Sequence, residues 1–184
     1  MYPDEPEAKL PVESQQNNWT YQELLSFLTG PSAIKGDSER GAAIFEKAQC
    51  QKCHRSGDRG DTVGPDLTTV AQRFQKKEIL ESILYPSQTI SDQYASFVVV
   101  SKTGRSFTGL VAPRPDGSVV VLQSNGDKTV IASDNIESRS RSKQSSMPEG
   151  LLNTLSLEEI ADLFAFLSKP SVGDLTAKPG TKAK

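Results

Sequence analysis

The stretch Cys50-Gln-Lys-Cys-His54 decides how the rest of the chain is interpreted. It holds the only two cysteines and the only histidine among the 184 residues. Two thiols separated by two residues, with an imidazole directly after the second, have the spacing of a c-type haem attachment site. The motif therefore predicts one covalent haem c, with Cys50 and Cys53 bonded to the haem and His54 bound to its iron.

Three other chemistries use the same residue types. A structural zinc site takes four protein ligands, usually Cys or His, and this chain offers three of them within five positions. A thioredoxin-like dithiol places Cys-x-x-Cys at the start of a helix in a βαβ unit, whereas here a helical pattern precedes the motif and a polar loop follows it. A plain disulfide is the third alternative, and haem attachment is the favoured interpretation.

Length and composition indicate a compact domain with room for a small addition. The chain has 35% hydrophobic and 24% charged residues, which is ordinary for a globular protein. Its net charge of -2 excludes a strongly basic nucleic-acid binder on global grounds, so we expect no nucleic-acid partner. No run of 18 apolar residues exists, so we expect no membrane span in this chain.

The first residues bear on location. Residues 1–16 are polar and lack the apolar core of a secretory signal. Because covalent haem attachment of this kind happens outside the cytoplasm, we expect a mature product, or a domain of a longer exported chain. The expected location is periplasmic or otherwise extracytoplasmic.

Apolar spacing and capping signals predict helices at both ends of the chain. Thr20 and Glu23 have capping-box spacing before an apolar stripe, and so do Ser156 and Glu159. The predicted helices cover about 20–29, about 38–48 directly before the cysteine motif, about 74–85, and from 156 to the proline at 170.

Between these helices the apolar period changes to that of strands. Short β-branched runs at 97–100, 106–111, 118–122 and 129–131 are separated by glycine-bearing turn signals. They predict an antiparallel meander of about four strands. The polar, serine-rich segment 134–146 is predicted to be a loop.

A haem iron bound by one histidine has a second axial face. His54 is the only histidine, and Met147 is the only methionine besides Met1. A lone methionine is more often a core gap-filler. Met147, however, follows a polar loop, is braced by Pro148 and precedes the closing helix, so we expect it to be the second ligand.

These motifs together resemble a mono-haem cytochrome c with His/Met ligation. Gly41 and Phe45 stand before the cysteine motif, Gly64-Pro-Asp-Leu67 follows it, and Met147 precedes a closing amphipathic helix. The His54-to-Met147 separation is too long for a minimal cytochrome of this type, and the meander accounts for the excess.

A more specific resemblance covers about residues 36–169. Ile83-Leu-Tyr-Pro-Ser-Gln-Thr-Ile90, the meander and Ser146-Met-Pro-Glu-Gly-Leu-Leu152 are similar to the haem-binding domain of the Planctomycetes and Verrucomicrobia type. That domain commonly ends large exported proteins with propeller-like, dehydrogenase-like or helical-repeat domains.

The resemblance implies a mainly α, cytochrome c-like fold around one covalent haem, with an inserted meander. It places an N-terminal extension with a short helix at 1–35, the cytochrome domain at 36–169, the insertion at 95–138 and a disordered tail at 170–184.

The resemblance also implies roles for individual residues. His54 and Met147 would be the axial ligands, the Pro65 carbonyl would accept the ring N–H of His54, and Leu67 would contact the cofactor. Gly41 and Phe45 would pack against aromatic residues of the last helix, with Phe164 as the expected partner.

The implied function is single-electron transfer, not enzymatic catalysis, with a redox partner protein or an upstream dehydrogenase-like domain. One alternative is a haem with an open or Met-displaceable site, which would serve a gas sensor or a peroxidase-like enzyme. Another is that the meander is a docking module, with Arg139, Arg141 and Lys143 steering an acidic partner. A solvated loop over a small stabilising sheet is the plainer interpretation of that region.

Overall fold

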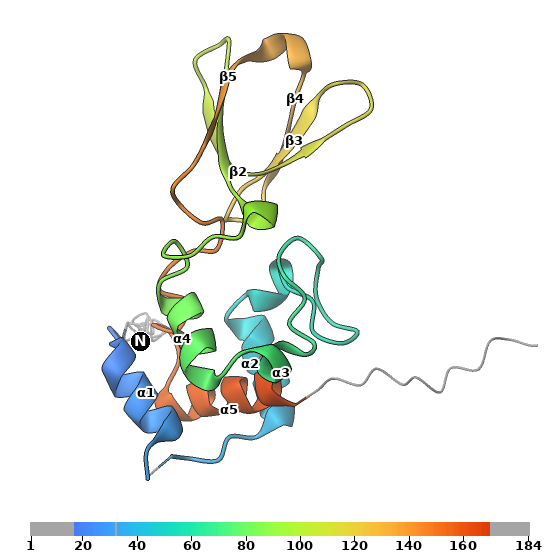
Figure 1. Cartoon of the computed structure of the whole chain (residues 1–184). Helices are drawn as coiled ribbons and strands as arrows, with labels where there is room; N and C mark the ends of the chain where they lie inside the picture. The colour runs from blue at the N-terminus through green and yellow to red at the C-terminus, as the bar shows by residue number, and fades with distance from the viewer. Residues whose placement is uncertain (1–16, 32, 170–184) are drawn as a thin grey trace, which may run out of the picture.

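The computed structural model describes residues 17–31 and 33–169, which form a helical body with a β-sheet lobe above it (Figure 1). The predicted tail at 170–184 and the polar segment 1–16 lie outside the described residues. The α-helices are α1 (Tyr21–Thr29), α2 (Ser38–Lys47), α3 (Val70–Arg73), α4 (Lys76–Leu84) and α5 (Leu157–Ser168). Short 3-10 helices are η1 (Cys50–Lys52), η2 (Asp92–Tyr94) and η3 (Ser133–Asn135).

Capping residues explain where the long helices begin. Thr20 and Ser156 form complete capping boxes with Glu23 and Glu159, as the sequence predicts, so the first amide groups of α1 and α5 are satisfied. The Asp37 carboxylate caps α2 by accepting from two backbone amides. The helix predicted at 74–85 is α4, and the short α3 before it lies in a segment that the sequence pattern leaves without an element.

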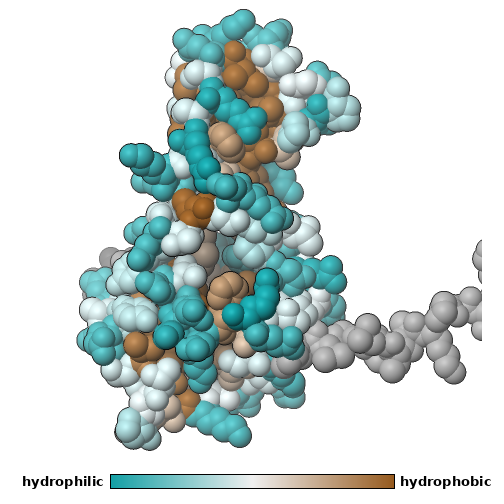
Figure 2. All heavy atoms as spheres, viewed as in Figure 1, coloured by the Kyte–Doolittle hydropathy of each residue, from teal (hydrophilic) through white to brown (hydrophobic). Residues whose placement is uncertain are grey.

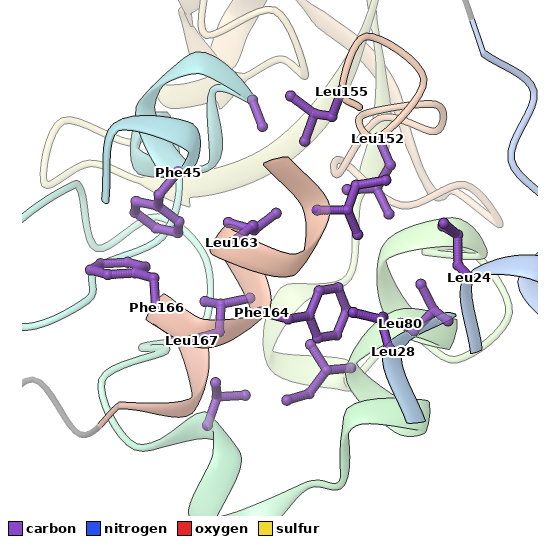
Figure 3. Packing of buried hydrophobic residues seen from close by; sticks show 14 residues of the cluster. Leu24, Leu28, Phe45, Leu80, Leu152, Leu155, Leu163, Phe164, Phe166 and Leu167 are labelled. Carbon is purple, nitrogen blue, oxygen red and sulfur yellow. The ribbon is translucent and has the colours of Figure 1, made fainter. Parts of the chain in front are cut away.

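One hydrophobic core joins all the long helices, with α5 at its centre (Figure 3). Leu24 of α1, Leu80 of α4 and Ile160 of α5 are fully buried. Burying a side chain of this size contributes about 1.5–3 kcal/mol. The described part of the N-terminal extension therefore shares the core of the helical body, while the division into domains remains a prediction.

The closest crossing in this core is between α2 and α5. A Cβ at Gly41 would collide with the backbone of Asp162, so glycine lets the two helices approach each other. Beside it the rings of Phe45 and Phe166 lie 5.3 Å apart and tilted. Phe45 thus packs against an aromatic residue of the last helix, as expected, but the partner is Phe166 and not Phe164, which faces another side of the same core (Figure 3).

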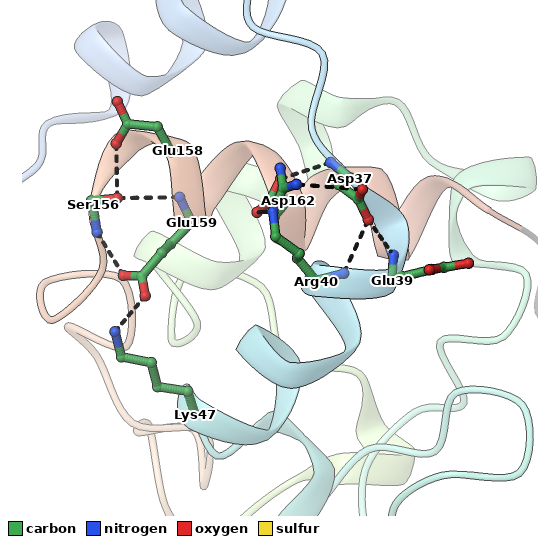
Figure 4. Close-up of polar contacts among 8 residues, drawn as sticks. All are labelled: Asp37, Glu39, Arg40, Lys47, Ser156, Glu158, Glu159 and Asp162. Atoms are coloured by element: carbon green, nitrogen blue, oxygen red, sulfur yellow. Dashed lines mark hydrogen bonds and ion pairs between the residues drawn. The ribbon is translucent and has the colours of Figure 1, made fainter.

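A buried carboxylate fixes the same crossing (Figure 4). Asp162 accepts from Arg40 at 2.7 and 2.9 Å and from the Asp37 amide at 2.7 Å. These bonds hold the pKa of Asp162 below its usual value, chiefly through the Arg40 hydrogen bond. Lys47 pairs with Glu159 further along, so polar contacts bind α2 to α5 at two places.

The lobe is one antiparallel sheet in the order β4-β3-β2-β1-β5. Its strands are β1 (Phe97–Ser101), β2 (Ser106–Pro113), β3 (Val119–Leu122), β4 (Lys128–Ile131) and β5 (Ile136–Arg141). Alternate residues of one face form a small second core around Val99 and Val121. Figure 2 shows hydrophobic residues reaching the surface of this lobe between hydrophilic ones.

The predicted meander is confirmed for β1 to β4, but the prediction of a loop at 134–146 is wrong in its first half. Its Ile-Glu-Ser-Arg-Ser-Arg segment forms β5, an edge strand paired with β1. The strand escaped prediction because Ile136 is its only apolar residue, so the segment shows no hydrophobic alternation. With five strands in the described residues, the description "mainly α" is only partly supported.

Among the described residues, no helix is long and apolar enough to cross a membrane.

Candidate haem-binding site

The cysteine motif lies on a tight turn at the end of α2. Gln49 adopts a left-handed conformation (φ 63°) and directs the chain from α2 into η1. The Cys50 carbonyl then accepts from the amides of Cys53 at 3.2 Å and His54 at 2.9 Å. The turn therefore fixes both thiols and the imidazole on one short, rigid segment.

The imidazole of His54 is oriented by the residues that follow the loop. Its Nδ1 lies 2.8 Å from the Pro65 carbonyl oxygen. Because a carbonyl only accepts, Nδ1 carries the proton and Nε2 keeps its lone pair. A Cβ at Gly64 would lie 2.9 Å from Cε1 of the ring, so glycine leaves room for this orientation.

The loop between His54 and Pro65 is tied to the motif at several points. The Asp61 amide donates to the Gln51 carbonyl at 2.9 Å, and the Leu67 amide donates to the Arg55 carbonyl at 2.8 Å. Gly60 has φ +87°, and a Cβ there would collide with the His54 carbonyl. The loop thus holds Pro65 in place as the acceptor for the imidazole.

Burial determines the protonation of these groups. It raises the pKa of the Cys50 thiol to about 11 and also raises the pKa of Cys53. It lowers the pKa of His54, against the opposing effect of the Pro65 hydrogen bond. At neutral pH the polypeptide thus holds two thiols and a neutral imidazole, the form of histidine that binds metals.

Serine residues anchor the segment that carries Met147. The Ser145 hydroxyl accepts from the Met147 amide at 3.1 Å, and the Ser145 amide donates to the Ser87 hydroxyl at 3.1 Å. Beside them Ser146 is hydrogen-bonded to the fully buried Ser96, oxygen to oxygen, at 2.7 Å. The serine-rich composition therefore has a structural role that the sequence pattern alone does not reveal.

All six residues predicted to contact a cofactor line one cavity of about 850 Å³. They are Cys50, Cys53, His54, Pro65, Leu67 and Met147. Much of the wall is also core, including Phe45, Val70 and Leu163. The charged lining residues are all exposed and therefore lie at the rim: Lys52, Asp66, Arg73 and Glu78.

The cavity fits a haem by three observations. It has the volume and the mainly apolar lining of a cofactor site. Two free thiols and a metal-competent imidazole belong to residues of one short turn in the lining, and Met147 lines the same cavity. Both axial ligand types needed for a His/Met haem are therefore present.

The alternative chemistries fit less well. Within residues 17–31 and 33–169, no group of three or more His, Cys, Asp or Glu side chains could hold a metal ion, which disfavours zinc. A reactive dithiol needs a lowered thiol pKa, whereas both pKa values are raised. Both thiols are free, so the structure does not support a disulfide.

The sequence pattern missed part of the lining. Leu110, Leu122, Gln123 and Ser124 of the sheet lobe reach the cavity, and so does Tyr94 of η2. Strand alternation alone could have put Leu110 and Leu122 on one face, but not the position of that face over the helical body.

Comparison with known proteins supports the class of protein that this site indicates. A family model described as "Cytochrome c" matches residues 38–98, from the start of α2 into β1. The matched segment includes the cysteine motif and Pro65 and ends before Met147.

A curated relative from Synechocystis sp. is described as "Cytochrome c-553-like". It is 42% identical over 53 residues, which are 28% of this chain and 48% of the relative. The match thus spans about half the length of that relative.

The fold, the site and these matches support a c-type cytochrome. Its cofactor is a covalently bound haem c, which contains iron.

Proposed function

We propose that this chain transfers single electrons through a haem c attached to Cys50 and Cys53, with His54 and Met147 as axial ligands. The observation that carries the proposal is the convergence of these four residues on one largely apolar cavity. Met147 lies far from the motif in the sequence, and its place in the lining of the same cavity supports the proposal.

Hydrogen bonds hold the residues around the proposed cofactor in fixed positions. Pro65 fixes the imidazole, and the serine contacts fix the segment of Met147. When bound, the haem supplies a one-electron iron couple. A protein that holds both ligands firmly suits a site that exchanges an electron without rearrangement.

Electron transfer is favoured over peroxidase-like chemistry or gas binding. His54 is the only histidine, so this chain has none to spare for a distal base. The guanidinium of Arg73 donates to the Asp66 carbonyl at 3.0 Å and is exposed at the rim. Neither His54 nor Arg73 is therefore positioned to act as a catalytic group beside Met147.

The wider setting is part of the same proposal. The resemblance over 36–169 favours a cytochrome domain at the C-terminal end of a larger exported protein, in the periplasm or another extracytoplasmic space. The electron donor or acceptor would then be a partner protein or an upstream dehydrogenase-like domain.

A spectroelectrochemical titration of the matured chain tests the proposed function. We expect one reversible one-electron transition and, in the oxidised form, the charge-transfer band of a methionine-ligated ferric haem. A high-spin oxidised spectrum with rapid uptake of cyanide, or of carbon monoxide after reduction, would instead favour the open-site alternative.

A further inference from the structure

The β2–β3 corner, which is the pair Leu110–Leu122 at the end of the two strands away from their turn, forms part of the cavity wall. Leu110 of β2 and Leu122 of β3 are directly paired across the two strands. Both line the cavity, followed by Gln123 and Ser124. The sheet lobe therefore supplies one wall of a site whose other walls belong to the helical body.

A glycine determines where this corner lies. β2 pairs with β1 as far as Gly109 and with β3 from Leu110 onward. A Cβ at Gly109 would collide with the backbone of Leu122, so the two strands touch closely at this point. Only glycine permits this close approach of β2 to β3. The approach therefore sets the position of the paired leucines.

The same strand provides a comparison within the sheet. Val120 lies two residues before Leu122 and therefore on the same face of β3. It is half-buried and lies outside the cavity lining. A change at Val120 thus perturbs the sheet without changing the wall of the cavity.

We propose that the β2–β3 corner is a positioning element that excludes water from the haem and raises its reduction potential through Leu110 and Leu122. This inference rests on the proposed function, because it requires a haem in the cavity. Oxidation adds a positive charge to the iron, and an apolar, water-poor surrounding disfavours that charge. The inserted sheet is then part of the redox site and not only a docking module.

Point variants of the full, haem-loaded chain test this inference. We expect Leu110→Ser and Leu122→Ser to lower the midpoint potential and to speed uptake of carbon monoxide by the reduced protein several-fold. Gln123→Leu should shift the potential in the opposite direction, because it makes the wall more apolar. Val120→Ser should keep the wild-type potential.

Each outcome decides the inference. Equal potentials in Leu110→Ser, Leu122→Ser and wild type would overturn it, and so would an equal shift in Val120→Ser. If the serine variants at the leucines do not fold, Gln123→Leu decides, since an unchanged or lower potential in that variant contradicts the inference. A wild-type chain without haem would refute the proposed function itself. Intact mass detects the missing haem and so separates this outcome from the two potential measurements that would overturn the inference.

Discussion

The orientation of one imidazole depends on backbone groups that a motif search does not read. The sequence predicts His54 as a ligand, and the resemblance predicts the Pro65 carbonyl as the acceptor of its ring N–H. The structure has these two groups 2.8 Å apart and adds the space left by Gly64. Glycine and proline are ordinary turn residues, so the sequence alone cannot separate a turn from an imidazole support.

At Met147 we predict that replacement by Ala keeps the haem attached but lowers the potential. The fall should be an appreciable part of the roughly 0.8 V range that axial ligands span. The methionine charge-transfer band should vanish. Leu151→Ala is the matched control for the spectrum, because Leu151 lines the same cavity and carries no sulfur, so the band should remain. An oxidised Met147→Ala spectrum identical to that of wild type would exclude a ligand role.

At Gly64 we predict that Ala destabilises the protein by about 1–3 kcal/mol, because its methyl group presses on the imidazole of His54. Denaturant unfolding of the haem-loaded protein measures the change. Thr62→Ala, an exposed substitution in the same loop, should stay near the wild-type stability. Equal stability of Gly64→Ala and wild type would show that the His54 ring can move aside without cost.

Among the elements, capping signals made the helices predictable and edge position made one strand unpredictable. Thr20 and Ser156 predict the starts of α1 and α5 from the sequence, because a cap is a local interaction. β5 depends on pairing with β1, which is distant in the sequence, and its own residues carry no pattern. The α2–α5 crossing likewise cannot be predicted from local sequence, because it depends on the contact between Gly41 and Asp162, which are far apart in the chain.

Asp162 gives this crossing a pH dependence. Its folded pKa is lowered, so its contribution to stability is present above the unfolded value near 3.8 and is lost as pH falls through the folded pKa. We predict that Asp162→Asn costs about 1–2 kcal/mol at pH 7. The difference from wild type should shrink below about pH 4.

Thermal or urea unfolding across pH measures this difference. Asp58→Asn, which removes an exposed carboxylate from the loop after the cysteine motif, is the matched control. A deficit in Asp162→Asn that is the same at acidic and neutral pH would show that the ionised carboxylate is not what matters.

For the whole molecule, the placement of the sheet lobe over the helical body is the feature least accessible from sequence (Figure 1). The sequence predicts the insertion and its first four strands, yet nothing local says which end of the sheet faces the cofactor. The cavity forms only when Leu122 in the lobe and Met147 before α5 are brought to the same place.

The lobe also carries a cluster of positive charge that two contacts hold in place. Arg141 pairs with Asp92 at 2.7 Å, and the Arg139 guanidinium lies 4.1 Å from the centre of the Phe97 ring. With Lys143 nearby in sequence, these charges stand on a chain whose net charge is -2. Any steering by them is therefore local and screened beyond about 8 Å at physiological salt.

We predict that electron exchange with an anionic redox complex slows as ionic strength rises, and that replacing Arg139, Arg141 and Lys143 by Gln weakens this dependence. Stopped-flow rates at low and physiological salt measure both effects. Lys128→Gln on the opposite edge strand, β4, is the control and should change little. A rate indifferent to salt would remove the steering role.

The most direct test of the whole account is the intact mass, under denaturing conditions, of the chain after maturation in a host that attaches haem. We predict the mass of the polypeptide plus one haem, and the mass of the bare polypeptide when Cys50 and Cys53 are both replaced by Ala. A correctly matured wild-type chain with the bare polypeptide mass would contradict covalent attachment and the function built on it.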